Sequence, residues 1–350
     1  MLLFFQVQPK HEIHWETLKV PLCGLVECFS RYRRQFSQIE VKHDHLPANF
    51  KNLGLDDLEF HGPILSTFVL LLIPWPPART VSHSLLAHTS MLIDTHAHLY
   101  SRKFSDDRPD MIRRAIAAGI DRIYLPNIDS GSIEAMLSLE ADFPEHCFAM
   151  MGLHPCSVQP DTYEQELDIV EHWLGQRNWA GIGETGIDLH WDQSTLAIQQ
   201  LAFARQIEWG KELGLPVIIH ARKANRECLQ VVRDGQDGRL RGIFHCFSGT
   251  LDEAKEMIDL NFMLGIGGTL TYPNSELPEV LRSIPLEHIV LETDAPYLPP
   301  VPYRGKRNES AYVRHVAETL AQIKSVSLEE VGRITSNNAL RMFAATLPKA

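Results

Sequence analysis

Histidines and carboxylates stand directly after short apolar runs throughout the C-terminal part of this 350-residue chain. These side chains are the usual protein ligands of divalent metal ions. In chain order the candidates are His96, His98, His154, Glu184, His220, His245 and Asp294. One histidine after an apolar run is more often an ordinary polar residue than a ligand, but chance does not explain so many in successive positions. The pattern therefore predicts a metal centre.

The number of candidate ligands predicts two divalent ions. Four histidines and two carboxylates, without His154, exceed what one four-coordinate ion with an open position needs. Glu184 is the expected bridge, because a carboxylate has two oxygens and its strand lies between those of the other ligands. The nitrogen-rich set suits Zn, and Mn or Mg with added water ligands would also fit. We expect one ion to be held by His96, His98 and Asp294, and the other by His220 and His245.

Such a centre predicts hydrolysis by an activated water. Two divalent ions lower the pKa of a bound water to about 7 and offset negative charge on a phosphoryl group. Asp294 would orient or deprotonate this water as the general base. His154 remains after the ligands are counted, so we assign it to the substrate phosphate or to the leaving group.

Cations and aromatic residues near the same strand ends predict contacts with a phosphate-containing substrate. Arg222 follows His220 by two residues and therefore shares its face of the strand. The loop after the last strand contains Arg304 and Lys306, and barrels often bind phosphate there. Asn308 in that loop is expected either to hydrogen-bond the same ligand or to hold the loop. Two aromatic residues are expected either to stack a terminal base or to pack at the rim, namely Tyr272 and Tyr297.

The elements that must position these residues follow from the apolar pattern. From Met91 onward, short β-branched runs alternate with longer amphipathic stretches, which is typical of α/β proteins. Eight such units predict a (β/α)8 TIM barrel with its catalytic groups at the C-terminal ends of the strands, and a doubly wound open sheet is the alternative. Helices at 328–333 and 336–345 are expected to close the barrel. The expected strands are 92–95, 122–125, 147–151, 180–183, 217–219, 242–244, 262–264 and 288–291.

Residues 1–90 lack this periodicity and are expected to form a separate N-terminal extension. Their apolar run, 64–73, is shorter than the ~20 residues that span a bilayer. Met91 directly precedes the first expected strand, so the extension is either a poorly ordered appendage or lies upstream of a natural start at Met91. Peptides from 1–90 in a mass spectrum of the native protein would exclude the second interpretation. The expected domains are 1–90 and 91–350.

Composition and charge narrow the classes of function. Hydrophobic residues make up 44% of the chain and charged residues 22%, which excludes a wholly disordered chain and a multi-span membrane protein. The net charge is −11 and falls in residues 91–350, so a broad basic surface for duplex DNA is not expected. The six cysteines form no C-x-x-C pair, which favours a reducing cytoplasm. We expect no membrane association and find no sign of a protein partner.

Six polar motifs follow one another along residues 91–347. They are D-T-H-A-H (94–98), G-L-H-P (152–155), G-I-G-E-T-G-I-D (181–188), I-I-H-A-R (218–222), F-H-C-F-S-G (244–249) and E-T-D-A-P-Y-L-P-P (292–300), the last followed by R-G-K-R-N-E (304–309). Together they resemble the TatD family of metal-dependent deoxyribonucleases, a branch of the amidohydrolase-like barrels. The resemblance implies a divalent-metal nuclease, often a 3′-to-5′ exonuclease on single-stranded DNA or RNA. It implies as metal ligands His96, His98, Glu184, His220, His245 and Asp294.

The sequence departs from the family pattern at positions that bear on substrate preference. Leu189 and His190 stand where the family more commonly has aromatic residues, and Ser310 stands where proline is common.

Alternative functions use the same site. The same metals could serve an amide, lactone or other ester hydrolase, or an aminoacyl-tRNA ester hydrolase. Many dinuclear relatives with amidase activity bridge their metals through a modified lysine on strand four, so Glu184 favours a phosphoesterase. The non-enzyme alternative is a binding or quality-control protein with a vestigial site, against which the complete ligand set argues.

Overall fold

The computed structural model describes residues 2–7, 13–18 and 91–344. Contacts within the chain divide it into two compact units, Met1–Ser84 and Leu85–Ala350. In the first unit, strands β1 (Leu2–Val7) and β2 (Ile13–Leu18) pair in antiparallel fashion, with Leu2 opposite Leu18. The rest of the expected extension 1–90 lies outside the described residues.

Parallel strands in the second unit close into a barrel, which confirms the predicted fold class. A three-stranded sheet, in the order β3-β4-β5, and a five-stranded sheet, in the order β10-β9-β8-β7-β6, form its wall. Backbone bridges join the two sheets at both seams, between Ala97 and Ala295 and between Met151 and Ile182. The strands are β3 (Leu92–Asp94), β4 (Ile120–Pro126), β5 (Cys147–Met150), β6 (Ile182–Asp188), β7 (Val217–Arg222), β8 (Gly242–Phe244), β9 (Phe262–Ile266) and β10 (Ile289–Leu291).

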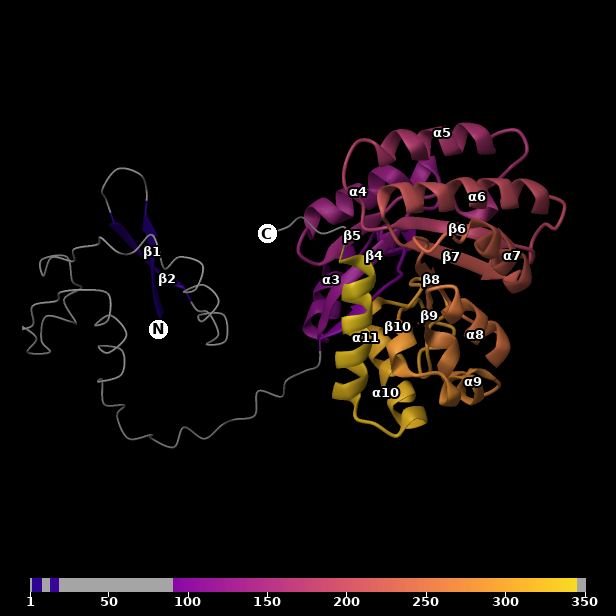
Figure 1. Ribbon diagram of the computed structural model, residues 1–350. Helices are drawn as coiled ribbons and strands as arrows, with labels where there is room; N and C mark the ends of the chain where they lie inside the picture. Colours follow the sequence, from indigo (N-terminus) through magenta and orange to yellow (C-terminus); the bar gives the residue numbers. More distant parts are fainter. Residues whose placement is uncertain (1, 8–12, 19–90, 345–350) are drawn as a thin grey trace, which may run out of the picture. The chain divides into compact units, whose positions relative to one another are not determined.

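Helices alternate with these strands and surround them on the outside (Figure 1). Their apolar faces, such as Leu229 and Val232 of α7, are buried against the strands. In the residues that the structure describes, none of the helices is both long and apolar enough to cross a membrane. The helices are α3 (Arg108–Ala117), α4 (Ile133–Asp142), α5 (Tyr163–Leu174), α6 (Leu196–Leu213), α7 (Asn225–Gly235), α8 (Leu251–Asp259), α9 (Leu277–Ser283), α10 (Val313–Lys324) and α11 (Leu328–Phe343).

The last helix, α11, is continuous, whereas the sequence predicts two helices at 328–333 and 336–345. The gap between them consists of Ile334 and Thr335, which are β-branched and weak helix formers, and Ser336, Asn337 and Asn338 follow directly. Tertiary hydrogen bonds hold these residues in helical geometry: Ser336 donates to the Met91 carbonyl oxygen at 2.8 Å. Asn338 donates to the carbonyl oxygens of Leu286 and Ile289 at 2.7 and 2.8 Å.

An apolar cluster between α11 and the strands fills the N-terminal end of the barrel. The α11 residue Phe343 stacks on Tyr124 of β4 with their ring centroids 3.7 Å apart. The cluster combines inward-facing strand residues, Ala180 just before β6, and residues of α11; its members are Ile93, Tyr124, Met150, Ala180, Ile218, Ile243, Val290, Ala339, Met342 and Phe343. Because this end is packed with apolar side chains, polar groups gather at the opposite end of the strands.

A buried carboxylate joins the first and last strands of the barrel. Asp94, at the end of β3, accepts hydrogen bonds from the Thr293 backbone N–H at 2.9 Å and from its hydroxyl at 2.6 Å. Burial raises the pKa of Asp94 to about 7. These bonds cross the seam between β3 and β10 and fix the residues on either side of it, His96 and Asp294.

The strand that carries Glu184 differs from its prediction. We expect a strand at 180–183 with Glu184 after its end, but β6 continues to Asp188 and contains Glu184. Its pairing with β7 shifts register between Ile182 and Thr185, an irregularity of the kind that re-aims side chains next to active sites. Gly186 has a φ of +132°, and a side chain there would collide with the His220 carbonyl oxygen. Glycine at position 186 is thus needed for close strand contact.

Candidate metal centre

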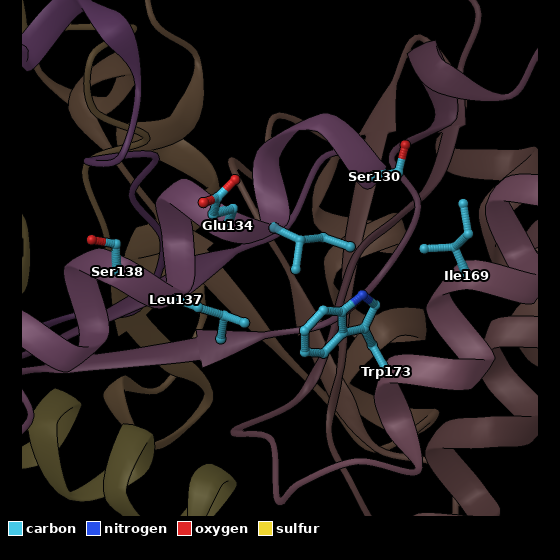
Figure 2. Close-up of a pocket in the computed structure, with 7 residues that line it drawn as sticks. Ser130, Glu134, Leu137, Ser138, Ile169 and Trp173 are labelled. Carbon is cyan, nitrogen blue, oxygen red and sulfur yellow. The ribbon is translucent and has the colours of Figure 1, made fainter.

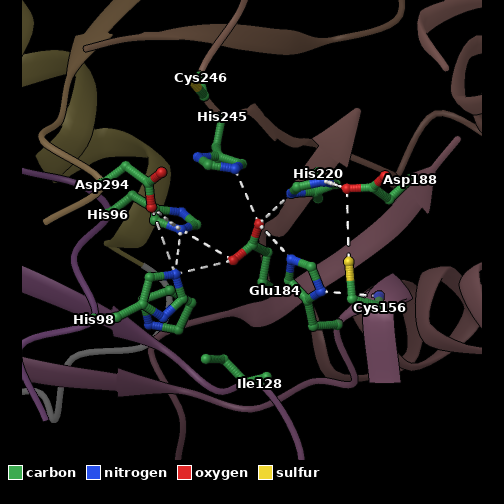
Figure 3. Close-up of polar contacts among 12 residues, drawn as sticks. His96, His98, Ile128, Cys156, Glu184, Asp188, His220, His245, Cys246 and Asp294 are labelled. Carbon is green, nitrogen blue, oxygen red and sulfur yellow. Dashed lines mark hydrogen bonds and ion pairs between the residues drawn. The ribbon is translucent and has the colours of Figure 1, made fainter. Parts of the chain in front are cut away.

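The two oxygens of Glu184 face different pairs of histidines at the C-terminal end of the barrel (Figure 3). Oε2 lies 3.2 Å from Nε2 of His96 and 3.2 Å from Nε2 of His98. Oε1 lies 2.7 Å from Nδ1 of His220 and 2.9 Å from Nε2 of His245. The Glu184 side chain is almost completely buried. A carboxylate placed between two pairs of imidazoles can bridge two cations.

Asp294 joins the His96 and His98 side of this cluster. Its Oδ1 lies 3.6 Å from Nε2 of His98 and 3.9 Å from Nε2 of His96. Its backbone N–H donates to the His96 carbonyl oxygen at 2.9 Å, which ties the loop after β10 to the end of β3. Burial raises the pKa of Asp294 to about 6. The structure therefore brings together the three residues that the sequence groups around one ion.

Tyr100 determines which nitrogen of His98 faces the centre. The Tyr100 hydroxyl donates to the Pro126 carbonyl oxygen at 2.5 Å, so it accepts from Nδ1–H of His98 at 2.9 Å. In the neutral imidazole, the Nε2 atom then carries a lone pair toward Glu184 and Asp294. A hydrogen bond behind a histidine fixes metal ligands in this way in many proteins.

Asp188 plays the same part for His220. Its Oδ2 lies 2.9 Å from Nε2 of His220, and a carboxylate can only accept, so in the neutral ring that binds a metal Nε2 carries the hydrogen and Nδ1 the lone pair. Although burial raises the pKa of Asp188, hydrogen bonds from His220 and from the backbone of His190 hold it below its usual range. Asp188 is therefore an anion that orients His220.

Glu292 stands behind His245. Its Oε1 lies 3.3 Å from Nδ1 of His245 and accepts a hydrogen bond from the backbone N–H of Cys246 at 2.5 Å. A side chain at Gly265 would collide with Oε2 of Glu292, so the glycine makes room for the carboxylate. Burial alone would lower the pKa of His245, but the carboxylates of Glu184 and Glu292 raise it well above its usual value.

The donor set fits divalent cations. Nε2 of His98 carries a lone pair, yet it faces Oε2 of Glu184 at 3.2 Å and Nε2 of His96 at 3.3 Å. Burial would raise the pKa of Glu184, but the surrounding histidines, His154 first, hold it well below its usual value. Lone pairs and an anionic carboxylate converging in a buried site repel one another unless a cation lies between them.

His154 presents the opposite tautomer to the centre. Its Nδ1 accepts a hydrogen bond from the Cys156 backbone N–H at 3.0 Å, so in the neutral ring the hydrogen lies on Nε2. Burial lowers the pKa of His154, which favours this neutral form. Nε2 lies 3.4 Å from Oε1 of Glu184, close enough to be grouped geometrically with possible ligands. Because Nε2 carries a hydrogen, His154 acts toward the centre as a donor.

The expected substrate contacts lie at the rim, with one exception. Arg222, Arg304 and Lys306 have exposed side chains. The expected substrate contact of Asn308 is not supported, because its side chain is fully buried. Its Nδ2 donates to the carbonyl oxygens of Thr293 at 2.8 Å and Tyr297 at 2.7 Å. Asn308 therefore holds the loop, which was its alternative role.

Sequence reasoning assigned no role to three residues that orient histidines, namely Tyr100, Asp188 and Glu292. For one of them the spacing carried a signal that could have found it. Asp188 follows Glu184 by four residues along β6, whereas Tyr100 lies in a turn and Glu292 follows the end of β10. Even spacing in a strand places side chains on the same face. The signal does not say which histidine Asp188 contacts, because that depends on neighbouring strands.

A surface hollow elsewhere lacks such a ligand set (Figure 2). It lies between α4 and α5 and has a volume of about 610 Å³. Glu134 is the one acidic residue that lines it, among serines and apolar side chains that include Leu137, Ile169 and Trp173. It therefore does not compete with the barrel mouth as a metal centre.

Comparison with known proteins agrees with this geometry. The family model described as "TatD related DNase" matches residues 93–344. The uncharacterized metal-dependent hydrolase YabD of Bacillus subtilis (strain 168) is 37% identical over 254 residues, which are 72% of this chain and 99% of YabD. The 3′-5′ ssDNA/RNA exonuclease TatD of Edwardsiella piscicida is 30% identical over 258 residues, covering 72% of this chain and 99% of that protein. The crystal structure of YJJV, a TatD homolog from Escherichia coli K12, matches with a TM-score of 0.67 and 28% identity, covering 74% of this chain and all of YJJV.

Proposed function

This chain belongs to the family of TatD-related DNases and is a metal-dependent hydrolase, and we propose that it cleaves phosphodiester bonds of nucleic acid, as a 3′-to-5′ exonuclease on single-stranded DNA or RNA. The name of the Edwardsiella piscicida relative, a 3′-5′ ssDNA/RNA exonuclease, supports this polarity and substrate. The four described cysteines are free thiols, which supports a reducing compartment such as the cytoplasm.

The placement of Glu184 between two pairs of histidines carries the proposal. Its separate oxygens support a site for two divalent ions, Zn, Mn or Mg, with Glu184 as the shared ligand. His96, His98 and Asp294 would hold one ion on the Oε2 side, and His220 and His245 would hold the other on the Oε1 side. When bound, such ions make a water more acidic and offset the charge that develops on the phosphoryl oxygens.

The protein supplies a proton acceptor and a proton donor on opposite sides of Glu184. Asp294 accepts the proton of the attacking water, because its carboxylate is the one at this mouth that is partly exposed, at 15%. His154 offers Nε2–H to the phosphate or to the leaving oxygen, since its Nδ1 is occupied by the Cys156 backbone. The water and the leaving group lie on opposite sides of phosphorus in an in-line attack, which agrees with this division.

Rim cations would hold the phosphates that flank the cleaved bond. Arg222 extends from the end of β7, and Arg304 and Lys306 from the loop after β10. Because the net charge is −11, these cations and the ions supply the local attraction that the rest of the surface lacks. A narrow contact of this kind favours binding to the end of a strand over binding along the length of a duplex.

The test is cleavage of labelled single-stranded DNA, RNA and duplex by the full chain, supplied with Mg, Mn or Zn. We expect release of mononucleotides from the 3′ end of the single strands, and loss of that activity in Glu184→Ala. Glu140→Gln, on the outer helix α4, is the matched control and should remain active. Cleavage of none of the three substrates would contradict the proposal. Hydrolysis of a lactone or carboxyl ester instead would favour the alternative hydrolase.

A further inference from the structure

We propose that Trp191 and Arg222 form a binding site for one nucleotide, in which the indole stacks the base and the guanidinium binds the adjacent phosphate. This inference rests on the proposed function, because it assigns a subsite to a single-stranded nucleic acid. The site lies at the mouth of the barrel beside the His220 side of the metal centre.

The first observation is the exposure of a large aromatic side chain. Trp191 is 73% exposed, more than any other large hydrophobic residue in 91–344. It lies in the loop between β6 and α6, three residues after Asp188. A single exposed hydrophobic residue is common and proves nothing by itself. Its surroundings give it a function.

The loop that carries Trp191 is held on both sides. His190 donates its backbone N–H to Oδ1 of Asp188 at 2.8 Å, and Leu189 donates to the Arg222 carbonyl oxygen at 3.0 Å. On the far side, Ser194 donates to Asp192 through its backbone N–H at 2.8 Å and its hydroxyl at 2.7 Å. The indole is therefore presented on a pre-organised turn, which lowers the entropy cost of binding.

Arg222 places a cation against this ring. The guanidinium carbon lies 5.4 Å from the centroid of the indole of Trp191, within the range of a cation–π contact. The side chain is exposed and close enough to Asp188 to help lower the pKa of that carboxyl, but among the described residues none forms an ion pair with Arg222 within 4.0 Å. Its planar donors are thus available to a phosphate, for which their geometry is well suited.

The pair is linked to the metal centre through Asp188. In the parallel pairing of β6 and β7, Asp188 lies opposite Arg222 and Gly186 lies opposite His220. Asp188 also contacts Nε2 of His220 at 2.9 Å, and His220 contacts Glu184. A nucleotide held by Trp191 and Arg222 therefore lies next to the atoms that surround the reacting phosphate.

A second aromatic–cation pair stands on the other side of the centre. Lys103 lies over the ring of Tyr297 at 4.6 Å, and that ring packs against His98 at 6.2 Å between centroids. The two pairs thus flank opposite sides of Glu184, one beside His98 and one beside His220. Stacking platforms combined with cations are how proteins bind single strands with little sequence preference. A base stacked on Trp191 cannot at the same time remain stacked in a duplex.

Binding without hydrolysis tests the site directly. The probe is a fluorescein-labelled single strand of ten deoxythymidines, measured by anisotropy with the full chain in EDTA. We expect Trp191→Ala to weaken its binding roughly 5- to 100-fold and Trp191→Phe to weaken it less than about threefold, since Phe also stacks. A decamer of abasic nucleotides has the same phosphates, so its binding should be unchanged by Trp191→Ala and weakened by Arg222→Ala.

Leu201→Ala is the matched control, because Leu201 is 62% exposed but lies on α6. It should bind both probes like the wild type. Equal binding of the thymidine decamer by the wild type and Trp191→Ala would overturn the inference even if the wild type cleaves nucleic acid. Dependence of binding on Trp191 in a wild type that cleaves no nucleic acid would support the site and contradict the proposed function. Absence of binding by the wild type would overturn the inference as well.

Discussion

Glu292 lies behind His245, with its Oε1 3.3 Å from Nδ1 of the imidazole. The other nitrogen of that ring points to Glu184 at 2.9 Å. A fully buried carboxylate thus lies within ion-pair distance of a histidine that points to Glu184. Asp188 is placed behind His220 in the same way and is also hydrogen-bonded to it, so both histidines on the Oε1 side of Glu184 have an acidic partner behind them.

Replacing Glu292 by glutamine keeps the size of the side chain and the acceptor for the Cys246 N–H but removes the negative charge. We expect the affinity for Zn or Mn to fall about 10- to 100-fold, because His245 loses the partner that orients it and raises its basicity. Isothermal titration with the metal measures this change. Glu140→Gln, whose carboxylate pairs with Arg177 outside the centre, should leave the affinity unchanged. Equal affinities in the two variants would show that Glu292 does not support the ligand.

Asp188→Asn leaves an amide that can donate to His220 and so favours the wrong tautomer. We expect the second equivalent of metal to bind about 10- to 100-fold more weakly, while the first binds as in the wild type. Metal content after dialysis at limiting free metal should fall from two ions per chain toward one. Asp192→Asn, in the same loop but bonded to Ser194, is the control. Two tightly held ions in Asp188→Asn would contradict this role.

The variant His154→Gln tests whether His154 is a proton donor or a metal ligand. Because Nε2 of His154 carries a hydrogen, we expect metal affinity to stay within about threefold of the wild type while kcat falls about 10²- to 10⁴-fold. His220→Gln should lower metal affinity itself. The comparison needs metal titration and single-turnover cleavage of the same preparations. A large loss of metal affinity in His154→Gln would make His154 a ligand instead.

Asp107 lies away from the metal centre, and its hydrogen bonds with arginines predict that the stability of the protein depends on pH. Hydrogen bonds from Arg307 at 2.7 and 2.8 Å, with a further one from Arg114, hold its pKa well below the usual value of 3.8. Because the folded pKa is lowered, this stabilisation is present above about pH 4 and is lost as pH falls below it. We expect Asp107→Asn to lower the free energy of unfolding by about 1 kcal/mol at pH 7, and by less at pH 3.

Urea unfolding at the two pH values measures this difference. Asp110→Asn is the control, since Asp110 pairs with Arg113 at an exposed position. Its effect should stay below about 0.5 kcal/mol at both pH values. An effect of Asp107→Asn that is the same at pH 3 and pH 7 would show that the ion pair with Arg307 is not its cause.

The amino-acid pattern alone predicted the barrel and the convergence of its polar residues. Short apolar runs mark the strands, because a parallel strand that is buried on both faces consists almost entirely of apolar residues. Side chains that follow such runs share one end of the barrel, so His96, Glu184 and His220 could be brought together without knowledge of distances. These conclusions depend on residue type and on spacing within one segment.

The hydrogen-bond partners of the site residues come from other segments of the chain. The roles that depend on these partners therefore became visible only in the three-dimensional structure. Whether His154 binds a metal or donates a hydrogen bond depends on the Cys156 backbone at its Nδ1, and whether Asn308 meets substrate depends on the Thr293 carbonyl. The continuity of α11 depends likewise on the carbonyl oxygens of Met91, Leu286 and Ile289. Hydrogen bonds are short and directional, so the register between strands and the packing of loops select each partner. A sequence specifies which groups can bond, and the fold brings one of the possible partners within about 3 Å.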